Sequence, residues 1–237
     1  ICSLVPNEDR LSMVVQIEFD RHTRIVGTDF MAAVIHSHAR FDYPGVAAAL
    51  AGDLRGKRKA YEPFMPMLRD MQDLGRRLRH ARFARGALDL DLPEVKIALD
   101  EDDPRRIRDV LRARKEPGER GAYALIEEFM LAANEAVARS FSERNEDTLY
   151  RIHDAPDEEK LEIFAQLASR YGIDVNLDDA RTPRGLAQTL AQLQLHPAGK
   201  PLAFQLLRSL KQATYDVVNV GHFGLAGPDT GSRNHNG

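Results

Sequence analysis

The N-terminal part of the chain has the hydrophobic pattern of β-strands. Residues 13–19 contain β-branched and aromatic side chains in partial alternation with polar ones, which indicates a strand. The polar run 20–23 predicts a turn, and residues 25–38 continue as a second extended segment. Residues 43–45 (Tyr-Pro-Gly) are expected to break this pattern, because a proline and the residue before it resist continuation. The alanine-rich run 46–54 then predicts a short helix.

Helical periodicity is clearest in two later segments. Apolar residues recur on one face of residues 65–83, and a wider apolar stripe over residues 123–141 predicts a buried central helix. The opposite face of the first helix is basic, with Arg76, Arg77, Arg79, Arg82 and Arg85. Three further helices are expected over 157–171, 183–194 and 201–214, each introduced by a proline.

A second β pattern lies between the two long helices. Residues 88–92 and 95–99 each alternate apolar and polar side chains around Pro93 and Glu94, which predicts a hairpin or a bent strand pair. Residues 101–104 are expected to form a loop. The order of strands, helix, hairpin and helices predicts an α+β fold, with a mixed sheet and packed helices.

Composition narrows the class of protein. The 237 residues are enough to bury a sizeable core. Lys and Arg number 33 against 36 Asp and Glu, a net charge of −3, which excludes a globally basic nucleic-acid coat but not local basic patches. The single cysteine, Cys2, excludes an intrachain disulfide and a Cys-rich zinc module.

Two further expectations concern location and completeness. No apolar run approaches the roughly 18 residues that span a bilayer, and no signal-peptide pattern opens the chain. We therefore expect a soluble, cytoplasmic protein with no membrane partner. The chain begins without Met and ends in a polar run, 227–237, so we expect part of a larger domain followed by a disordered, divergent tail.

Several residue pairs have the chemistry of a metal site. His36 and His38 would share a face of a strand, but nothing nearby completes a zinc site, so hydrogen-bonded or surface histidines are the favoured interpretation. Asp89 with Asp91, and the run 100–103, are candidates for Mg²⁺ or acid–base chemistry. A solvated face is the favoured alternative for both acidic groups.

The basic and glycine-rich stretches also allow more than one interpretation. The basic helix face over 76–85 and a second arginine-rich run, 105–115, have the charge to bind phosphates, although a solvated surface explains them as well. The glycines in 221–227 are spaced three apart, which matches neither a dinucleotide fingerprint nor a phosphate loop. Residue types alone therefore indicate an α+β domain and no reaction.

A set of short stretches, taken together, resembles the RNB catalytic domain of the ribonuclease II and ribonuclease R exoribonucleases, most closely the bacterial ribonuclease R branch. Each stretch is weak alone, but they occur in the family's order across residues 1–226. The stretches are 1–13, 36–43, 85–94, 125–137, 149–156, 207–213 and 221–226. Residues 1–226 are accordingly interpreted as a partial RNB catalytic domain.

The resemblance implies processive 3′→5′ hydrolysis of single-stranded RNA to nucleoside monophosphates, with Mg²⁺ ions held by an Asp cluster in a two-metal mechanism. In the family that cluster lies just upstream of the stretch matching Ile1, and an arginine-bearing Thr-Ser-Pro-Ile-Arg-Arg-type motif follows the stretch matching Ala226. Neither motif occurs in these 237 residues. We therefore assign no catalytic and no metal-binding residue, and expect the chain to be inactive alone.

Four residues carry over as RNA-binding candidates. Tyr43 matches a tyrosine that stacks on bases near the 3′ end of the RNA; a half-buried tyrosine beside a proline is the alternative. His153 begins a loop that bears an aromatic clamp residue in some relatives, where this chain has alanine. His222 and Phe223 match a motif at the domain centre. Packing in the core is an equally good interpretation of these two residues. Single-stranded RNA, not DNA, is the expected partner. A non-catalytic RNA-binding or scaffold module derived from an RNB domain is the alternative function.

Overall fold

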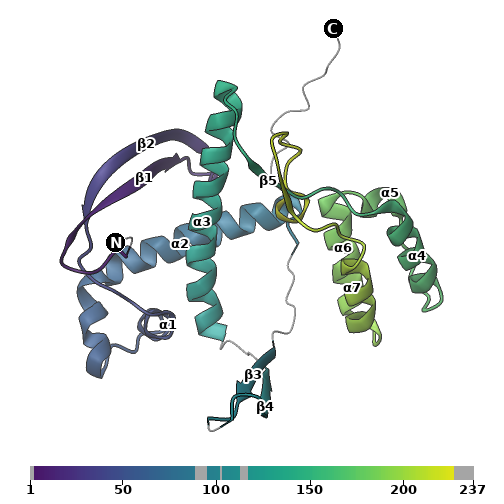
Figure 1. Cartoon of the computed structure of the whole chain (residues 1–237), viewed down its shortest axis with the longest axis horizontal. Coiled ribbons are helices and arrows are strands. Elements are labelled where there is room, and N and C mark those ends of the chain that lie inside the picture. The colour runs from purple at the N-terminus through teal and green to yellow at the C-terminus, as the bar shows by residue number, and fades with distance from the viewer. Residues whose placement is uncertain (1–2, 89–94, 102, 113–116, 227–237) are drawn as a thin grey trace. The chain divides into compact units, whose positions relative to one another are not determined.

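The computed structural model describes residues 3–88, 95–101, 103–112 and 117–226. Helices and strands follow one another along the chain (Figure 1), and the α+β prediction is confirmed. Among the described residues the strands form three two-stranded sheets. The chain divides into two compact units. The first contains residues 1–14, 30–76 and 90–129, and the second contains 15–29, 77–89 and 130–237. The predicted tail, 227–237, lies outside the described residues.

The predicted strand–turn–strand is a hairpin of β1 (Asp9–Phe19) and β2 (Ile25–His36). Its turn is closed by the Asp20 carboxylate, which accepts hydrogen bonds from the backbone N–H groups of Arg24 (2.9 Å) and His22 (2.8 Å). The hydrogen bond from the Arg24 backbone is the main cause that lowers the pKa of Asp20 to about 2. The ionised carboxylate of Asp20 therefore fixes this turn. Because the contacts that close the turn are local in sequence, the strand–turn–strand pattern could be predicted.

Helix α1 (Tyr43–Leu50) begins where a break was expected. The Asp42 carboxylate caps its first turn by accepting from the Gly45 backbone N–H at 2.6 Å. Pro44 lies in that first turn, where its missing N–H is not needed. The predicted break of the extended pattern is confirmed, because β2 ends at His36 and proline here starts a helix. The helix predicted over 46–54 begins three residues earlier and ends at Leu50. The following 3₁₀ helix, η1 (Gly56–Phe64), was not predicted. The small core of this unit consists of Ala49, Tyr61, Met65 and Leu68.

Helix α2 (Met65–Arg85) confirms the first long helix. It ends at Gly86, whose φ of +107° suits glycine. A Cβ at this position would lie 2.6 Å from the backbone of Arg184, so the close approach also requires glycine. The predicted basic face is not uniformly exposed, because Arg82 is buried (5% exposed). Its guanidinium lies 4.9 Å from the centre of the Phe83 ring.

The second hairpin contains one predicted strand and one that was not predicted. Strand β3 (Val95–Leu99) confirms the predicted strand over 95–99 and pairs antiparallel with β4 (Ile107–Arg112). The predicted loop closes the hairpin, and the Asp103 N–H donates to the Asp100 carboxylate at 3.1 Å. Strand β4 was missed because it is so rich in arginine and aspartate that its alternation was read as a charge cluster. The predicted pairing of 88–92 with 95–99 depends on residues 89–94, which lie outside the described part of the chain.

Helix α3 (Pro117–Arg144) confirms the clearest helical segment. Its apolar stripe is buried only in part. Leu125 (5% exposed) and Ala136 (3%) are buried, whereas Met130 (60%) and Val137 (40%) are exposed. The expectation of a fully buried central helix was therefore wrong for those two positions in this structure.

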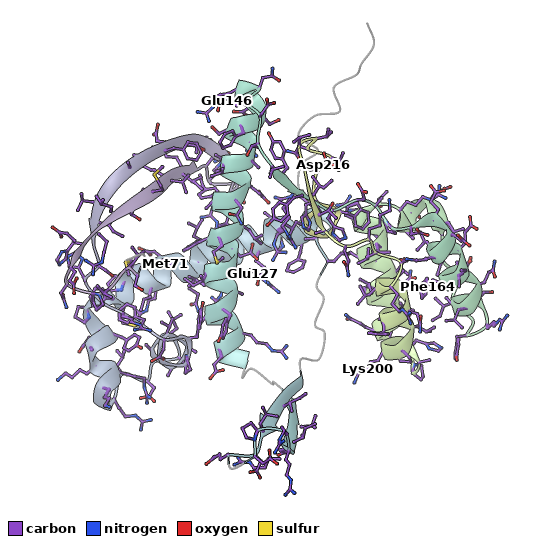
Figure 2. All side chains as sticks on the ribbon, in the orientation of Figure 1. Met71, Glu127, Glu146, Phe164, Lys200 and Asp216 are labelled. Carbon is purple, nitrogen blue, oxygen red and sulfur yellow. The ribbon has the colours of Figure 1, made fainter. Side chains whose placement is uncertain are left out.

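The second unit contains β5 (Tyr150–Ile152), β6 (Thr214–Asp216) and a helical region. The helices are α4 (Glu158–Ser169), α5 (Leu177–Ala180), α6 (Pro183–Gln194), α7 (Gly199–Leu207) and η2 (Phe223–Leu225). The bounds of α6 are those predicted, but α7 ends before Thr214, which pairs in β6 instead. The helices enclose a core in which Phe164 is a central member (Figure 2). No helix in the described ranges is long and apolar enough to cross a bilayer.

Candidate functional site

Two of the predicted RNA-binding residues meet across a short parallel bridge in the second unit. His153 follows directly after β5, and His222 directly precedes η2. The His153 N–H donates to the Gly221 carbonyl at 3.1 Å, and the Phe223 N–H donates to the His153 carbonyl at 2.8 Å. Backbone pairing therefore fixes the segment around His222 against the end of β5.

The His153 ring adds two more hydrogen bonds to this bridge. Its Nδ1 accepts from the Gly224 backbone N–H at 3.2 Å, and its Nε2 donates to the Lys211 carbonyl at 2.8 Å. A nitrogen that accepts carries no proton, so these contacts assign the neutral tautomer with hydrogen on Nε2. A Cβ at Gly224 would lie 3.1 Å from Nδ1, which makes glycine the residue that best allows this approach. His153 thus connects three segments of the chain.

His222 lies edge-to-face with His153, with ring centres 5.0 Å apart. Its buried Nδ1 has no hydrogen-bond partner in the described part of the chain. Burial is the main cause that lowers the pKa of His222, and the positive charge of Arg151 lowers it further. The environment therefore favours an uncharged imidazole.

Phe223 completes the sequence-predicted group, but its ring points into the protein. It is only 8% exposed and belongs to the hydrophobic core of the second unit. The structure therefore brings His153, His222 and Phe223 together. It places Phe223 where packing, rather than contact with a ligand, is its direct role.

Tyr43 lies in the first unit, at the first residue of α1. Its half-buried ring stacks on Tyr123 of α3, with ring centres 3.7 Å apart and planes inclined by 20°. One face of the Tyr43 ring is thus covered by a second tyrosine. Tyr123 was not singled out from the sequence, because a residue at the start of a helical stripe gives no sign of its distant partner. The role of Tyr43 in base stacking stays a prediction.

The other candidates from the sequence have structural partners. His36 Nδ1 lies 2.7 Å from the Asp9 carboxylate, which favours hydrogen-bonded histidines over a metal pair. The carboxylate of Asp103 pairs with Arg105 (3.1 Å) and Arg106 (3.7 Å). Asp89 and Asp91 lie outside the described residues.

No group of three or more His, Cys, Asp or Glu side chains gathers within the described ranges in a way that would hold a metal ion. The described residues do not fit the Mg²⁺ site that the family resemblance implies, and we derive no step of a reaction through a metal.

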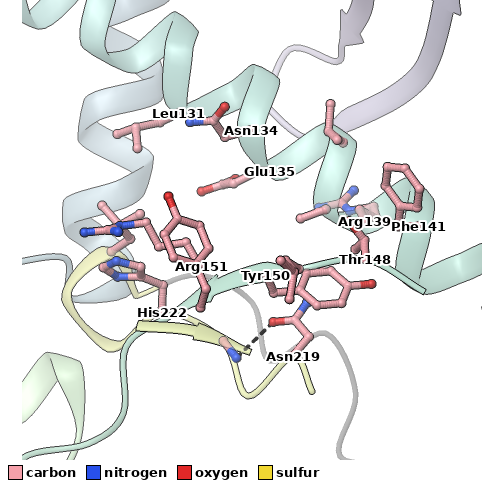
Figure 3. A pocket seen from close by; sticks show the side chains of 16 residues that line it. Leu131, Asn134, Glu135, Arg139, Phe141, Thr148, Tyr150, Arg151, Asn219 and His222 are labelled. Carbon is pink, nitrogen blue, oxygen red and sulfur yellow. Dashed lines mark hydrogen bonds between the residues drawn. The ribbon is translucent and has the colours of Figure 1, made fainter. Parts of the chain in front are cut away.

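The two basic clusters also make intramolecular contacts. Arg108 pairs with Glu101 at 3.3 Å, Arg77 donates to the Arg21 carbonyl at 2.7 Å, and the Arg79 guanidinium lies 4.6 Å from the centre of the Phe83 ring. These contacts support the interpretation that many of the arginines in the two clusters form a solvated surface and make structural contacts. A different pair of arginines lines a pocket next to His222 (Figure 3), and the sequence gave no sign of it.

Three kinds of comparison relate this geometry to known proteins. The model of the RNB domain family matches residues 1–230. Ribonuclease R of Thermotoga maritima is 39% identical over 228 residues, covering 95% of this chain and 31% of the relative. Ribonuclease R of Escherichia coli is 35% identical over 226 residues, covering 95% and 27%. The chain therefore spans less than a third of the length of these curated relatives.

Solved structures show the same likeness. The apo form of ribonuclease R from Mycoplasma genitalium superimposes with a TM-score of 0.83 at 28% identity, covering 95% of this chain and 34% of that one. The same protein has been solved with ribose-methylated single-stranded RNA and with double-stranded RNA, each with a TM-score of 0.82 to this chain.

Proposed function

The chain belongs to the RNB domain family, and from this we propose that it supplies part of the catalytic domain of an exoribonuclease. The proposed activity of the whole enzyme is processive 3′→5′ hydrolysis of single-stranded RNA to nucleoside monophosphates. The observation that carries the proposal is the match of the family model to residues 1–230. Identities of 35% and 39% to ribonuclease R over 95% of the chain support it.

Magnesium belongs to the whole enzyme in this proposal. The carboxylates that would hold Mg²⁺ are expected in a segment that the family carries upstream of the stretch matching Ile1. The 237 residues contain no such Asp-rich motif, so we propose that the chain alone binds RNA without hydrolysing it. We also place the protein in the cytoplasm, where its RNA substrates would be found.

RNA contacts in this chain are proposed at two places. The Tyr43 ring would stack on a base, which is a sequence-tolerant interaction. His153 and His222 would act together, because the hydrogen bonds of the His153 ring hold the backbone segment that carries His222. Phe223 would act through the packing that keeps this segment in place.

The alternative is a non-catalytic RNA-binding or scaffold module. The two functions can be distinguished by experiment in a protein whose flanking segments have been restored. A restored protein that binds RNA but releases no nucleotide in Mg²⁺ would be such a module.

Binding by the chain itself is tested with fluorescence anisotropy on labelled oligo(A). We expect saturable binding that weakens as salt rises, because phosphate contacts release counterions. Oligo(dA) of equal length should bind more weakly. Equal affinity for the two, or no binding at low salt, would contradict the proposal.

A further inference from the structure

A pocket of about 620 Å³ opens between α3, the β5–β6 sheet and the segment before η2 (Figure 3). All of its lining residues lie in the second unit. Its volume is in the range of small-ligand sites, roughly 300–1,000 Å³. The residues that matter for its chemistry are Arg139, Arg151, Tyr150, Tyr215, Asn134 and Glu135.

The charge of this pocket is positive. Half-buried Arg139 makes no ion pair or hydrogen bond with another described residue. Exposed Arg151 lies over the ring of Tyr215, 5.4 Å from its centre, and has no carboxylate partner in the described ranges. The acidic lining residue, Glu135, pairs with Arg85 at 3.7 Å. Two guanidinium groups therefore remain for an anion.

Two tyrosines, Tyr150 on β5 and Tyr215 on β6, line the pocket together with these charges. Figure 3 shows Arg139 on α3 and Arg151 on β5 toward opposite ends of the pocket. Tyr215, directly opposite Arg151 in the β5–β6 ladder, is 66% exposed. Flat rings beside cations are the combination that single-stranded nucleic acids use, since each base stacks and each phosphate pairs with a charge.

Asn134 supplies a group that can read a base. It is exposed on α3 and forms no hydrogen bond with the described residues. Its amide therefore has both a donor and an acceptor available, which is what the edge of a nucleobase presents in return.

We propose that this pocket binds one nucleotide of single-stranded RNA. The base lies against Tyr215, which shares a face of the β5–β6 ladder with Arg151; Asn134 contacts the base edge, and Arg139 and Arg151 each contact one of the phosphates that flank the nucleotide. The proposal rests on the proposed function, because RNA is the ligand. It adds a binding site whose residues are not among the four RNA-binding candidates named from the sequence.

The test is calorimetric titration of the 237-residue chain with adenosine, AMP and the 5′-phosphorylated diadenylate pApA. Affinity should rise in that order, by about tenfold for a phosphate that gains a guanidinium. In Arg139→Gln and Arg151→Gln this gain should be lost, while adenosine binding stays the same. Tyr215→Ala should weaken all three ligands. Arg170→Gln removes an equal charge from the end of α4, which does not line the pocket, and should bind as the parent does.

Variants are compared only if their circular dichroism and melting temperature match those of the parent. Equal affinity of the parent for adenosine, AMP and pApA, or unchanged pApA binding in both arginine variants, would overturn the proposal. Oligo(A) binding that persists in that case would leave the proposed function standing. Conversely, pApA binding without oligo(A) binding would contradict the proposed function and retain the pocket. If a hydrophobic dye binds in the pocket and none of the nucleotides displaces it, the proposal is overturned. A polypeptide segment then becomes the expected occupant of the pocket.

Discussion

His153 and Tyr43 were both predicted to face RNA, and they are held in opposite ways. His153 is fixed through its backbone N–H and carbonyl and through both ring nitrogens. Tyr43 is held by a ring-on-ring stack with Tyr123. A ring bound at both nitrogens cannot turn toward a ligand without losing hydrogen bonds. The difference indicates that His153 positions other groups, whereas Tyr43 is suited to direct contact with a base.

Replacement of His153 should give the largest effect. In His153→Ala the Gly224 N–H and the Lys211 carbonyl both lose their partner, so we expect a loss of about 2–4 kcal/mol in the free energy of unfolding. Urea denaturation measures this loss. His38→Ala, which removes a histidine ring from the first unit, is the control and should cost less than about 1 kcal/mol. An equal loss in both variants would show that the His153 hydrogen bonds add little.

Replacement of Tyr43 should affect stability less and RNA more. Tyr43→Ala removes one stacked pair and should cost about 1 kcal/mol, again by urea denaturation. In a complete enzyme with its flanking segments restored, it should lengthen the limit product, because short RNA depends most on base stacking, worth about 1–3 kcal/mol per base. Long RNA, held by many phosphates, should lose little rate.

Tyr43→Phe is the matched control, since it keeps the aromatic face, and it should give the parent's products. If Tyr43→Ala also gives the parent's products, Tyr43 only packs against Tyr123 and the contrast with His153 disappears.

The smallest effect is on pH dependence. Burial lowers the pKa of His222 in the folded state below its ordinary value of 6.5. On acidification the unfolded chain therefore takes up the proton first, so stability present above about pH 6.5 is lost as pH falls through the folded-state pKa. We expect a loss below about 1 kcal/mol, since His222 keeps some contact with solvent.

Melting temperature measured between neutral and mildly acidic pH tests this. His222→Gln, which does not titrate, should flatten the decline relative to the parent. A decline of the same steepness in both would assign the effect to groups other than His222.

The sequence predicted what is decided locally. The bounds of α6 follow from Thr182, whose hydroxyl caps the first turn, and from the proline that follows it. The pairing of β3 with β4 depends on the register between the two strands, and alternation alone does not select a partner. The stack of Tyr43 on Tyr123 and the pocket near His222 join residues distant in the chain, so a single sequence gives no signal for either. The sequence did not decide whether the Phe223 ring packs in the core or contacts a ligand, and only three-dimensional packing places the ring in the core.

The central claim is that these 237 residues carry RNA contacts without a catalytic metal site. The most direct test incubates the purified chain with labelled oligo(A) in Mg²⁺ or Mn²⁺ and measures released nucleoside monophosphate. We predict that the chain retains the RNA in an anisotropy assay and releases no nucleotide above a mock preparation, because the residues that the structure describes contain no carboxylate cluster to position the metals. Robust release that EDTA abolishes would contradict this account and direct attention to Asp89 and Asp91.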